Sequence, residues 1–319
     1  MSITSPIYTG RTLTGQNYAK HLMITPEGIA DMATSRNNAL FNQEFFTRTI
    51  SSVFIVLVII GGINYGGIAW TIIASVIAML SLGEYYRMIQ RTDTTGKRKN
   101  MRISPGMGYI FSLIFLIAAA RENPQPIVLG MILALCVCSV FVVEVFRKQL
   151  TKGAESYAIT NAGGVISGVL YITVPWVCMI MLRDYSFGRQ VLITLFVCTW
   201  GCDVGAYIGG KLFGSVKLCE YVSPGKTVQG FIAGILGSLI VNACAIYYYS
   251  LPAYPLIFIG FICGIAGQIG DLAESLIKRE SGQKDSGSLI PGHGGMLDRF
   301  DSILFNGLLT YLLLRVMLS

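Results

Sequence analysis

Long runs of apolar residues, separated by short polar segments, make up most of this chain. A bilayer core about 30 Å thick requires roughly 20 apolar residues in each helix that spans it. Nine runs come close to that length, although the third is short and Gly61, Gly62 and Gly66 interrupt the first. We therefore predict an all-α, polytopic integral membrane protein with helices at approximately 49–64, 68–88, 107–120, 126–146, 158–182, 190–209, 230–250, 254–278 and 297–318.

The basic residues indicate which side of the membrane each polar segment should face. Cytoplasmic segments of membrane proteins carry an excess of Lys and Arg. With a cytoplasmic N-terminus, all of the 24 basic residues fall on that side except Arg121, Arg183, Arg189 and Arg315. We therefore predict a cytoplasmic N-terminus, and we expect the segments 210–229 and 279–297 to be cytoplasmic loops.

The same pattern divides the chain into three regions. Residues 1–47 are polar with scattered apolar positions, and we expect a mobile cytoplasmic arm there. This region lacks the apolar core and the cleavage site of a signal peptide. Residues 48–189 form the N-terminal membrane helices, and residues 190–319 form a C-terminal membrane region in which we expect the chemistry to lie.

Composition supports a membrane protein and excludes several other classes. Apolar and aromatic residues form 53% of the chain and 13% is charged, whereas soluble domains carry about 25% charge. The eight cysteines lie mostly in apolar runs, which indicates packing rather than a disulfide framework or a zinc site. The net charge of +7 fits a cytoplasmic face beside anionic lipid, so it implies no nucleic-acid partner.

Carboxylates inside the later apolar runs are the first candidates for a functional site. A charge within a membrane must face a partner, a cavity or water. The helical rise of 1.5 Å per residue puts Asp203 about 20 Å and Asp271 about 25 Å from the outer ends of their helices. Asp298 begins its helix at the inner side, so all three should meet near the cytoplasmic interface, together with Glu274 and Asp301. Each of them alone could also be a polar helix end that the interface wets.

The segment before residue 228 carries groups that suit phosphate oxygens. Its sequence Ser223-Pro224-Gly225-Lys226-Thr227 supplies a hydroxyl, a lysine and backbone amides ahead of a helix. The ending Gly-Lys-Thr also occurs in P-loops. The first glycine of that motif would have to stand at Glu220, however, and we predict no strand before the helix. We therefore reject a P-loop.

The segment from Ser275 to Asp301 carries a longer and more specific pattern. It reads Ser275, two residues, Lys278-Arg279, four residues, Lys284-Asp285, small and apolar residues to Pro291, one residue, His293-Gly294-Gly295, two residues, Asp298-Arg299, one apolar residue and Asp301. This pattern resembles the signature of the phosphatidate cytidylyltransferase family, with every specified position filled. Asp203-x-x-Ala206-Tyr207 and Ser223-Pro224-x-Lys226-Thr227 are also similar to elements of that family, although Gln229 stands where many members have Glu. The close resemblance covers roughly residues 198–302.

The resemblance implies a nucleotidyl transfer at a membrane surface. CTP and phosphatidate would give CDP-diacylglycerol and pyrophosphate, with Mg²⁺ as the cofactor. Asp271 and Asp298 are then candidate catalytic residues and metal ligands, and Asp203 is a third candidate ligand. The alternative for Asp271 and Asp298 is an ion pair between helices, with Lys278 or Arg299.

The remaining residues of the pattern are candidates for binding the two anionic substrates. The candidate catalytic cations, which alternatively form only a basic rim that attracts anionic lipid, are Lys226, Lys278, Arg279, Lys284 and Arg299. Ser223 and Ser275 would donate to phosphate or bind the metal, unless they only cap the backbone. We expect Asp285 to order the loop by pairing with Lys284, Arg299 or a backbone amide. His293 would contact phosphate or orient the loop, and Asp301 would support Arg299 or the metal site.

Other functions stay open at this point. A transporter also carries carboxylates within a helical bundle, and a cytidylyltransferase for a different lipid phosphate, such as an ether lipid, would share the pattern. A CDP-alcohol phosphatidyltransferase is rejected, because the chain contains no Asp-Gly pair. The resemblance also implies a homodimer. The missing signal peptide and the cytoplasmic loops suit a bacterial inner membrane, with the active site facing the cytoplasm. An organelle membrane is the alternative.

Overall fold

The computed structural model of the protein describes residues 26–90, 103–121, 124–150, 157–250 and 253–317. The first 25 residues of the predicted arm lie outside this part of the chain, and so do the basic residues between 91 and 102. The chain divides into two compact units, residues 1–50 and residues 51–319. The site and all contacts discussed below lie within the second unit.

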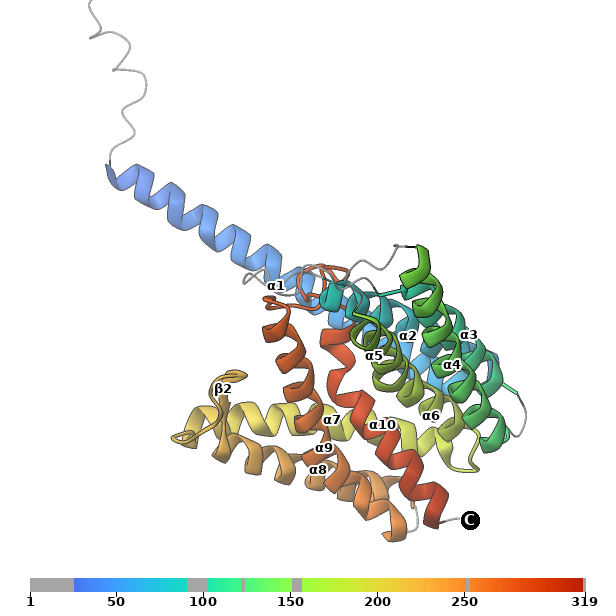
Figure 1. Ribbon diagram of the computed structural model, residues 1–319. Coiled ribbons are helices and arrows are strands. Elements are labelled where there is room, and N and C mark those ends of the chain that lie inside the picture. The colour runs from blue at the N-terminus through green and yellow to red at the C-terminus, as the bar shows by residue number, and fades with distance from the viewer. Residues whose placement is uncertain (1–25, 91–102, 122–123, 151–156, 251–252, 318–319) are drawn as a thin grey trace, which may run out of the picture. The chain divides into compact units, whose positions relative to one another are not determined.

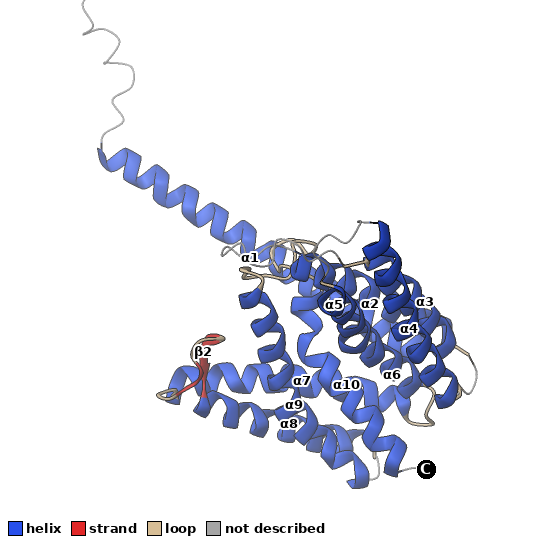
Figure 2. Cartoon of the chain, in the orientation of Figure 1, coloured by secondary structure: helices blue, strands red, loops and turns tan. Residues whose placement is uncertain are grey.

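Helices form almost the whole of the described chain (Figures 1 and 2). Between α5 and α6 one π-helical stretch, η1, continues the helix without a break, so that α5, η1 and α6 form one continuous helical run. The helical elements are α1 Pro26–Tyr65, α2 Gly67–Gln90, α3 Pro105–Ala119, α4 Pro126–Leu150, α5 Ala158–Gly168, η1 Val169–Thr173, α6 Val174–Arg183, α7 Gly188–Phe213, α8 Val228–Tyr249, α9 Ala253–Glu280 and α10 Leu297–Met317.

These helices confirm the predicted all-α membrane architecture. Within the described residues, eight helical segments are long and apolar enough to cross a bilayer, and each coincides with one of the predicted runs. The remaining run corresponds to α3, an apolar helix of 15 residues. Large apolar side chains such as Leu57, Val145 and Ile240 are exposed on the helices, as expected for surfaces in contact with lipid rather than water.

The predicted N-terminal arm differs from the structure in one respect. α1 begins at Pro26, so residues 26–47 are helical and continue directly into the first membrane span. Proline favours the first turn of a helix, and the residues that follow include several strong helix formers such as Ala, Met, Glu and Leu. The mobility of the arm and its side of the membrane remain predictions.

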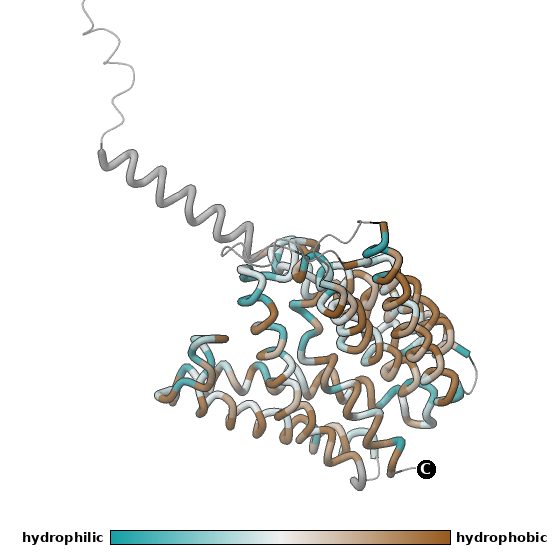
Figure 3. Tube along the Cα trace, in the orientation of Figure 1, coloured by the Kyte–Doolittle hydropathy of each residue, from teal (hydrophilic) through white to brown (hydrophobic). Residues whose placement is uncertain are grey.

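A small β-hairpin is the second difference. β1 Lys217–Cys219 and β2 Ser223–Thr227 pair antiparallel between α7 and α8. β2 runs directly into α8, where Thr227 Oγ1 accepts a hydrogen bond from Gly230 N at 3.1 Å. The expectation that no strand precedes this helix is therefore wrong, while the rejection of a P-loop still rests on Glu220. In Figure 3, hydrophilic residues gather at this hairpin and at the connection between α9 and α10.

Two kinds of packing fix the helices that carry the candidate residues. α7 and α8 touch backbone to backbone, since a Cβ on Gly205 would lie 2.7 Å from the carbonyl oxygen of Ala233. Small residues allow such close approach in membrane helices. α10 is anchored differently: the ring of Phe300 packs edge-on against Trp176 of α6 at 5.3 Å, and Trp176 lies 6.4 Å from Trp70 of α2. The start of α10 is thus held by helices of the N-terminal half.

Candidate active site

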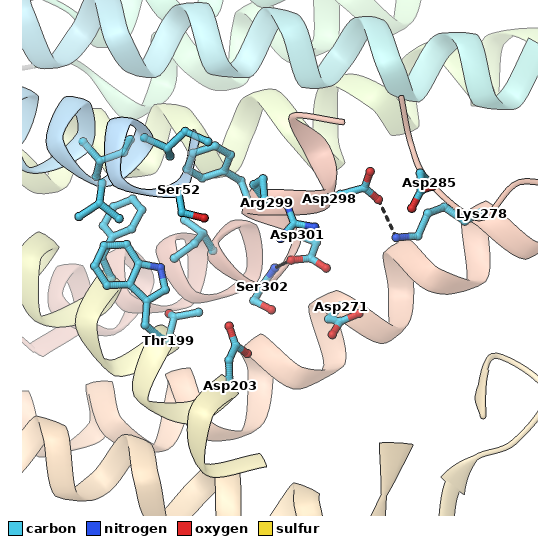
Figure 4. Close-up of a pocket in the computed structure, with 17 residues that line it drawn as sticks. Ser52, Thr199, Asp203, Asp271, Lys278, Asp285, Asp298, Arg299, Asp301 and Ser302 are labelled. Atoms are coloured by element: carbon cyan, nitrogen blue, oxygen red, sulfur yellow. Dashed lines mark hydrogen bonds and ion pairs between the residues drawn. The ribbon is translucent and has the colours of Figure 1, made fainter. Parts of the chain in front are cut away.

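A cavity of about 550 Å³ lies where α1, α7, α9 and α10 meet. Figure 4 shows Asp203 of α7, Asp271 of α9 and Asp301 of α10 directed toward a shared space. The predicted convergence of Asp203, Asp271 and Asp298 is confirmed, because all three line this cavity. Its charged lining consists of five carboxylates and two cations: Asp203, Asp271, Asp285, Asp298, Asp301, Lys278 and Arg299.

One wall of the same cavity is apolar. Ile55, Val56 and Ile59 of α1 face it, and so do aromatic side chains that include Phe196 and Trp200 of α7. The cavity therefore combines a charged floor with a surface that suits hydrocarbon. The sequence did not indicate this wall, because nothing in the apolar runs distinguishes residues that face lipid from residues that face a cavity.

A second cavity of about 490 Å³ lies between α7, α8, α9 and the β1–β2 hairpin. Asp203 and Asp271 line both cavities, so these two carboxylates stand at the boundary between them. Lys226 of β2 projects to the same boundary, where its Nζ lies 2.7 Å from Asp271 Oδ2. Lys211 and Thr227 also line the second cavity, which gives it a cationic and hydroxylic surface suited to phosphate oxygens.

Lys278 has a different environment from Lys226. It forms ion pairs with two carboxylates, Glu274 one turn earlier on α9 and Asp298 Oδ1 at 2.7 Å. Glu274 is fully buried. Because buried charges are costly unless they are paired, this arrangement holds the Lys278 ammonium in one place. For Asp298, the alternative of an interhelical ion pair with Lys278 is therefore the arrangement observed; Asp271 pairs instead with Lys226.

The second oxygen of Asp298 binds the backbone of the connection between α9 and α10. Asp298 Oδ2 accepts hydrogen bonds from Ser286 N at 2.9 Å, Ser286 Oγ at 2.9 Å and Gly295 N at 2.8 Å. Both oxygens of Asp298 are thus engaged within the protein. This carboxylate thus holds the connection. Asp285 forms no ion pair with Lys284 or Arg299 in the described part of the chain, and its role in ordering the loop stays a prediction.

Glu84 of α2 also binds the connection between α9 and α10, and the sequence analysis did not predict this contact. Its side chain is fully buried, and it accepts hydrogen bonds from Met296 N at 3.0 Å and Leu297 N at 2.8 Å. The signal was available, because Glu84 is also an acidic residue within an apolar run. It stands alone in its run, however, whereas the acidic residues of the second half form a group.

His293 orients the connection against α1. Its Nε2 lies 3.0 Å from Ser52 Oγ, and Ser51 Oγ donates to the Pro291 carbonyl at 3.3 Å. The flanking residues Gly292 and Gly294 have φ angles of 75° and 85°, a conformation that glycine adopts without strain. This geometry matches the loop-orienting alternative for His293, and a contact with phosphate remains a prediction.

Several predicted residues do not line either cavity. Arg279 donates to the carbonyls of Val222 and Gln283, each at 3.3 Å, so it links α9 to the hairpin and to its own loop. Ser275 Oγ donates to Asp271 Oδ1 at 3.3 Å and so supports that carboxylate. Ser223 lies in β2, and Lys284 is exposed on the loop. Substrate contacts by these residues remain predictions.

Two further positions have clear partners. Asp301 Oδ1 accepts from Ser302 N at 2.7 Å, and no ion pair joins it to Arg299 among the described residues. Gln229 Oε1 accepts from Ser215 N and Val216 N, while its Nε2 donates to Ser215 Oγ at 2.7 Å. Gln229 therefore orders the segment between α7 and β1 by accepting from two backbone amides and donating to a hydroxyl.

The donor set around the first cavity fits a hard divalent cation. Mg²⁺ prefers oxygen ligands and usually binds through one or two carboxylates, with water and substrate phosphates completing its shell. Among the described residues no three His, Cys, Asp or Glu side chains come close enough to hold a metal by themselves. Asp203 and Asp271 border both cavities. These two carboxylates match the one or two protein ligands with which Mg²⁺ usually binds.

The chain is similar to known proteins over most of its length. A model of the cytidylyltransferase family matches residues 46–317. A phosphatidate cytidylyltransferase of Staphylococcus aureus (strain COL) is 32% identical over 262 residues, which cover 81% of this chain and 94% of that protein. One from Staphylococcus haemolyticus (strain JCSC1435) is 30% identical over 260 residues, with the same coverage. One from Synechocystis sp. (strain ATCC 27184 / PCC 6803 / Kazusa) is 44% identical over 131 residues, 40% of this chain and 44% of that protein.

Proposed function

This chain belongs to the cytidylyltransferase family, and from that membership we propose that it acts as a phosphatidate cytidylyltransferase. It transfers CMP from CTP to phosphatidate and releases pyrophosphate, which makes CDP-diacylglycerol for phospholipid synthesis. The observation that carries the proposal is the first cavity, in which carboxylates and cations meet an apolar wall. A phosphorylated lipid requires this combination of surfaces.

The reaction joins two anions. A phosphate oxygen of phosphatidate attacks the α-phosphorus of CTP, the new P–O bond forms, and the bond between the α- and β-phosphates breaks. A phosphate monoester is largely ionised at pH 7, since its second pKa is about 6. The nucleophile therefore needs no general base, and the protein contributes mainly by positioning the reactants and stabilising charge.

Charge balance in the first cavity supports a metal-dependent reaction. Its five carboxylates outnumber its two cations, and two like charges 4 Å apart repel by about 4 kcal/mol near a protein surface. The cavity therefore disfavours a triphosphate that arrives without cations. We assign Mg²⁺ to Asp203 and Asp271; Asp298 would join them only by giving up its contact with Lys278. When bound, Mg²⁺ neutralises charge on the phosphates and on the leaving pyrophosphate.

The cations of the protein have separate roles in this proposal. Lys226 stands at the boundary of the two cavities, and it exchanges its partner Asp271 for phosphate oxygens of CTP. Lys278 is held by two carboxylates, so it supplies a fixed positive charge in the cavity wall. Arg299 lines the same cavity and binds the phosphate of the lipid, whose acyl chains lie along the apolar wall.

Location and assembly extend the same proposal. The apolar helices make the chain an integral membrane protein, and its relatives are bacterial. The excess of basic residues near the site supports a bacterial inner membrane with the active site facing the cytoplasm. This orientation gives the site access to CTP from the cytosol. We also propose that the protein forms a homodimer, as its resemblance to the family implies.

Product analysis tests the choice of lipid substrate. Purified protein in lipid nanodiscs receives CTP, Mg²⁺ and one lipid phosphate at a time: phosphatidate, an ether-linked analogue or lysophosphatidate. Mass spectrometry should detect CDP-diacylglycerol from phosphatidate at the highest rate. A higher rate with the ether-linked lipid would replace the substrate but keep the chemistry, whereas no CDP-lipid from any of them would refute the proposed activity.

A further inference from the structure

We propose that Glu84 of α2 is a positioning residue for the reaction. This inference rests on the proposed function. Glu84 holds the connection between α9 and α10 and, through Ser286, fixes Asp298 and the Lys278 that Asp298 binds. Glu84 lines neither cavity, so it acts on the site through other residues. We call its contacts with Ser286, Met296 and Leu297 the Glu84 clamp.

Among the described residues, the clamp gives a buried carboxylate hydrogen-bond donors but no ion-pair partner. Glu84 is fully buried, and no Lys or Arg in the described part of the chain forms an ion pair with it. An unpaired buried carboxylate is costly. Here the cost is offset by the amides of Met296 and Leu297 and by the hydroxyl of Ser286 at 3.2 Å. The positive end of the α10 dipole adds to this.

Ser286 connects the clamp to the site. Its Oγ lies 3.2 Å from Glu84 Oε2 and 2.9 Å from Asp298 Oδ2, so the two carboxylates share one hydroxyl hydrogen. Asp298 also accepts from Ser286 N, and its other oxygen binds Lys278 Nζ at 2.7 Å. The position of the Lys278 ammonium in the cavity therefore depends on Asp298, and the position of Asp298 depends on the connection that Glu84 holds.

Two glycines pack closely against the Glu84 carboxylate. A Cβ on Gly287 would lie 2.6 Å from Glu84 Oε1, and a Cβ on Gly295 would lie 2.6 Å from Glu84 Oε2. Both contacts are closer than real Cβ atoms approach, so the backbone reaches the carboxylate only because these residues are glycine. The amides of Gly295, Met296 and Leu297 donate to side-chain carboxylates of the protein. In this proposal they hold the loop in place, and the side-chain cations bind the substrate phosphates.

A role limited to fold stability would give different kinetics from a positioning role. A structural residue changes the amount of folded enzyme, and a positioning residue changes the turnover of each folded molecule. Displacing a catalytic group by about 1 Å can cost on the order of 100-fold in rate. Substrate binding to Lys226 and to the apolar wall does not involve the clamp, so the effect should fall on kcat more than on KM.

The first test compares Glu84→Gln with Glu144→Gln in the full-length protein. Glu144 is a matched control: it is 3% exposed on α4, binds Arg147 and Asn161, and lines neither cavity. Glu84→Gln should lower kcat about tenfold or more with KM for CTP within about twofold. Glu144→Gln should keep kcat within about twofold of wild type even if its Tm falls. Wild-type kcat in Glu84→Gln, or the same loss in both variants, would overturn the proposal.

The second test displaces the clamp without removing the carboxylate. Gly287→Ala should reproduce the fall in kcat, while Gly163→Ala, which meets nothing within 4 Å, should not. If Glu84→Gln fails to fold, this pair of glycine variants still tests the positioning role.

A third test uses the double variant Glu84→Gln/Ser286→Ala. Its kcat should fall no further than that of the worse single variant, because both residues act through one path. Additive losses would reject the link through Ser286. Absence of activity in wild type would instead refute the proposed function.

Discussion

At the scale of single residues, Lys226 is the cation that stands between the two cavities. Its Nζ binds Asp271 and lies 3.4 Å from the Gln268 carbonyl, so it is positioned by the same helix that carries the candidate metal ligand. Lys217, on the paired strand, instead donates to the Pro224 carbonyl at 2.7 Å and lines neither cavity. The two lysines of one hairpin therefore have different surroundings.

This difference gives the first prediction. Lys226→Met should raise KM for CTP about tenfold or more, since a hydrogen bond to a charged group contributes about 1.5–3 kcal/mol. Lys217→Met should leave KM for CTP unchanged, because its side chain only closes the hairpin. Steady-state pyrophosphate release at varied CTP measures both. Equal effects of the two substitutions would show that the hairpin contributes only general positive charge.

The contacts of Asp298 and Glu84 mark how far single residues could be predicted. Helical spacing and rise placed Asp203, Asp271 and Asp298 at one depth, and the structure brings them together. The sequence could not reveal that both oxygens of Asp298 are bound to Lys278 and the loop backbone. It also could not join Glu84 to Leu297, because 213 residues separate them in the chain.

At the scale of elements, the hydrophobic runs predicted the helices to within a few residues, and the hairpin was missed. β2 contains Pro224 and Gly225, residues that are depleted from strands, so its sequence indicated a loop. The start of α1 was missed for the opposite reason. Its polar residues are good helix formers, but they lack the apolar period on which the prediction depended.

The contact between α7 and α8 gives an element-scale prediction. Gly205→Ala should destabilise the protein by about 1–3 kcal/mol, because overpacking forces the two backbones apart. The new Cβ would lie 2.7 Å from the Ala233 carbonyl oxygen, whereas a Cβ on Gly163 meets nothing within 4 Å. Thermal unfolding should therefore show a lower Tm for Gly205→Ala alone. An unchanged Tm would mean that α7 and α8 do not pack this closely in the membrane.

At the scale of the whole molecule, the start of the family match and the start of the second compact unit lie close together in the chain. The family model starts at residue 46, and the second compact unit starts at Ser51. The apolar runs could predict the helices, since these follow from contact with lipid. The orientation expected from the basic residues stays a prediction. Assembly into a dimer could not be derived, because a helix face that packs on a second copy is as apolar as one that faces lipid.

Orientation gives the prediction at this scale. CTP does not cross a bilayer, so inside-out vesicles that contain the protein should release pyrophosphate from external CTP, and sealed right-side-out vesicles should not. Detergent should make the two preparations equally active. Activity of sealed right-side-out vesicles without detergent would place the site on the opposite side and contradict the orientation proposed from the basic residues.

The central claim is that the cavity bordered by Asp203 and Asp271 transfers CMP from CTP to phosphatidate. The most direct measurement is pyrophosphate release by the purified full-length protein, with CTP, phosphatidate and Mg²⁺ omitted one at a time. We predict release only when all three are present, and a loss of about 100-fold or more in Asp271→Asn. Asp184→Asn, a substitution outside both cavities, should keep the wild-type rate. Folded wild-type protein that releases no pyrophosphate, or Asp271→Asn that releases it at the wild-type rate, would contradict this account.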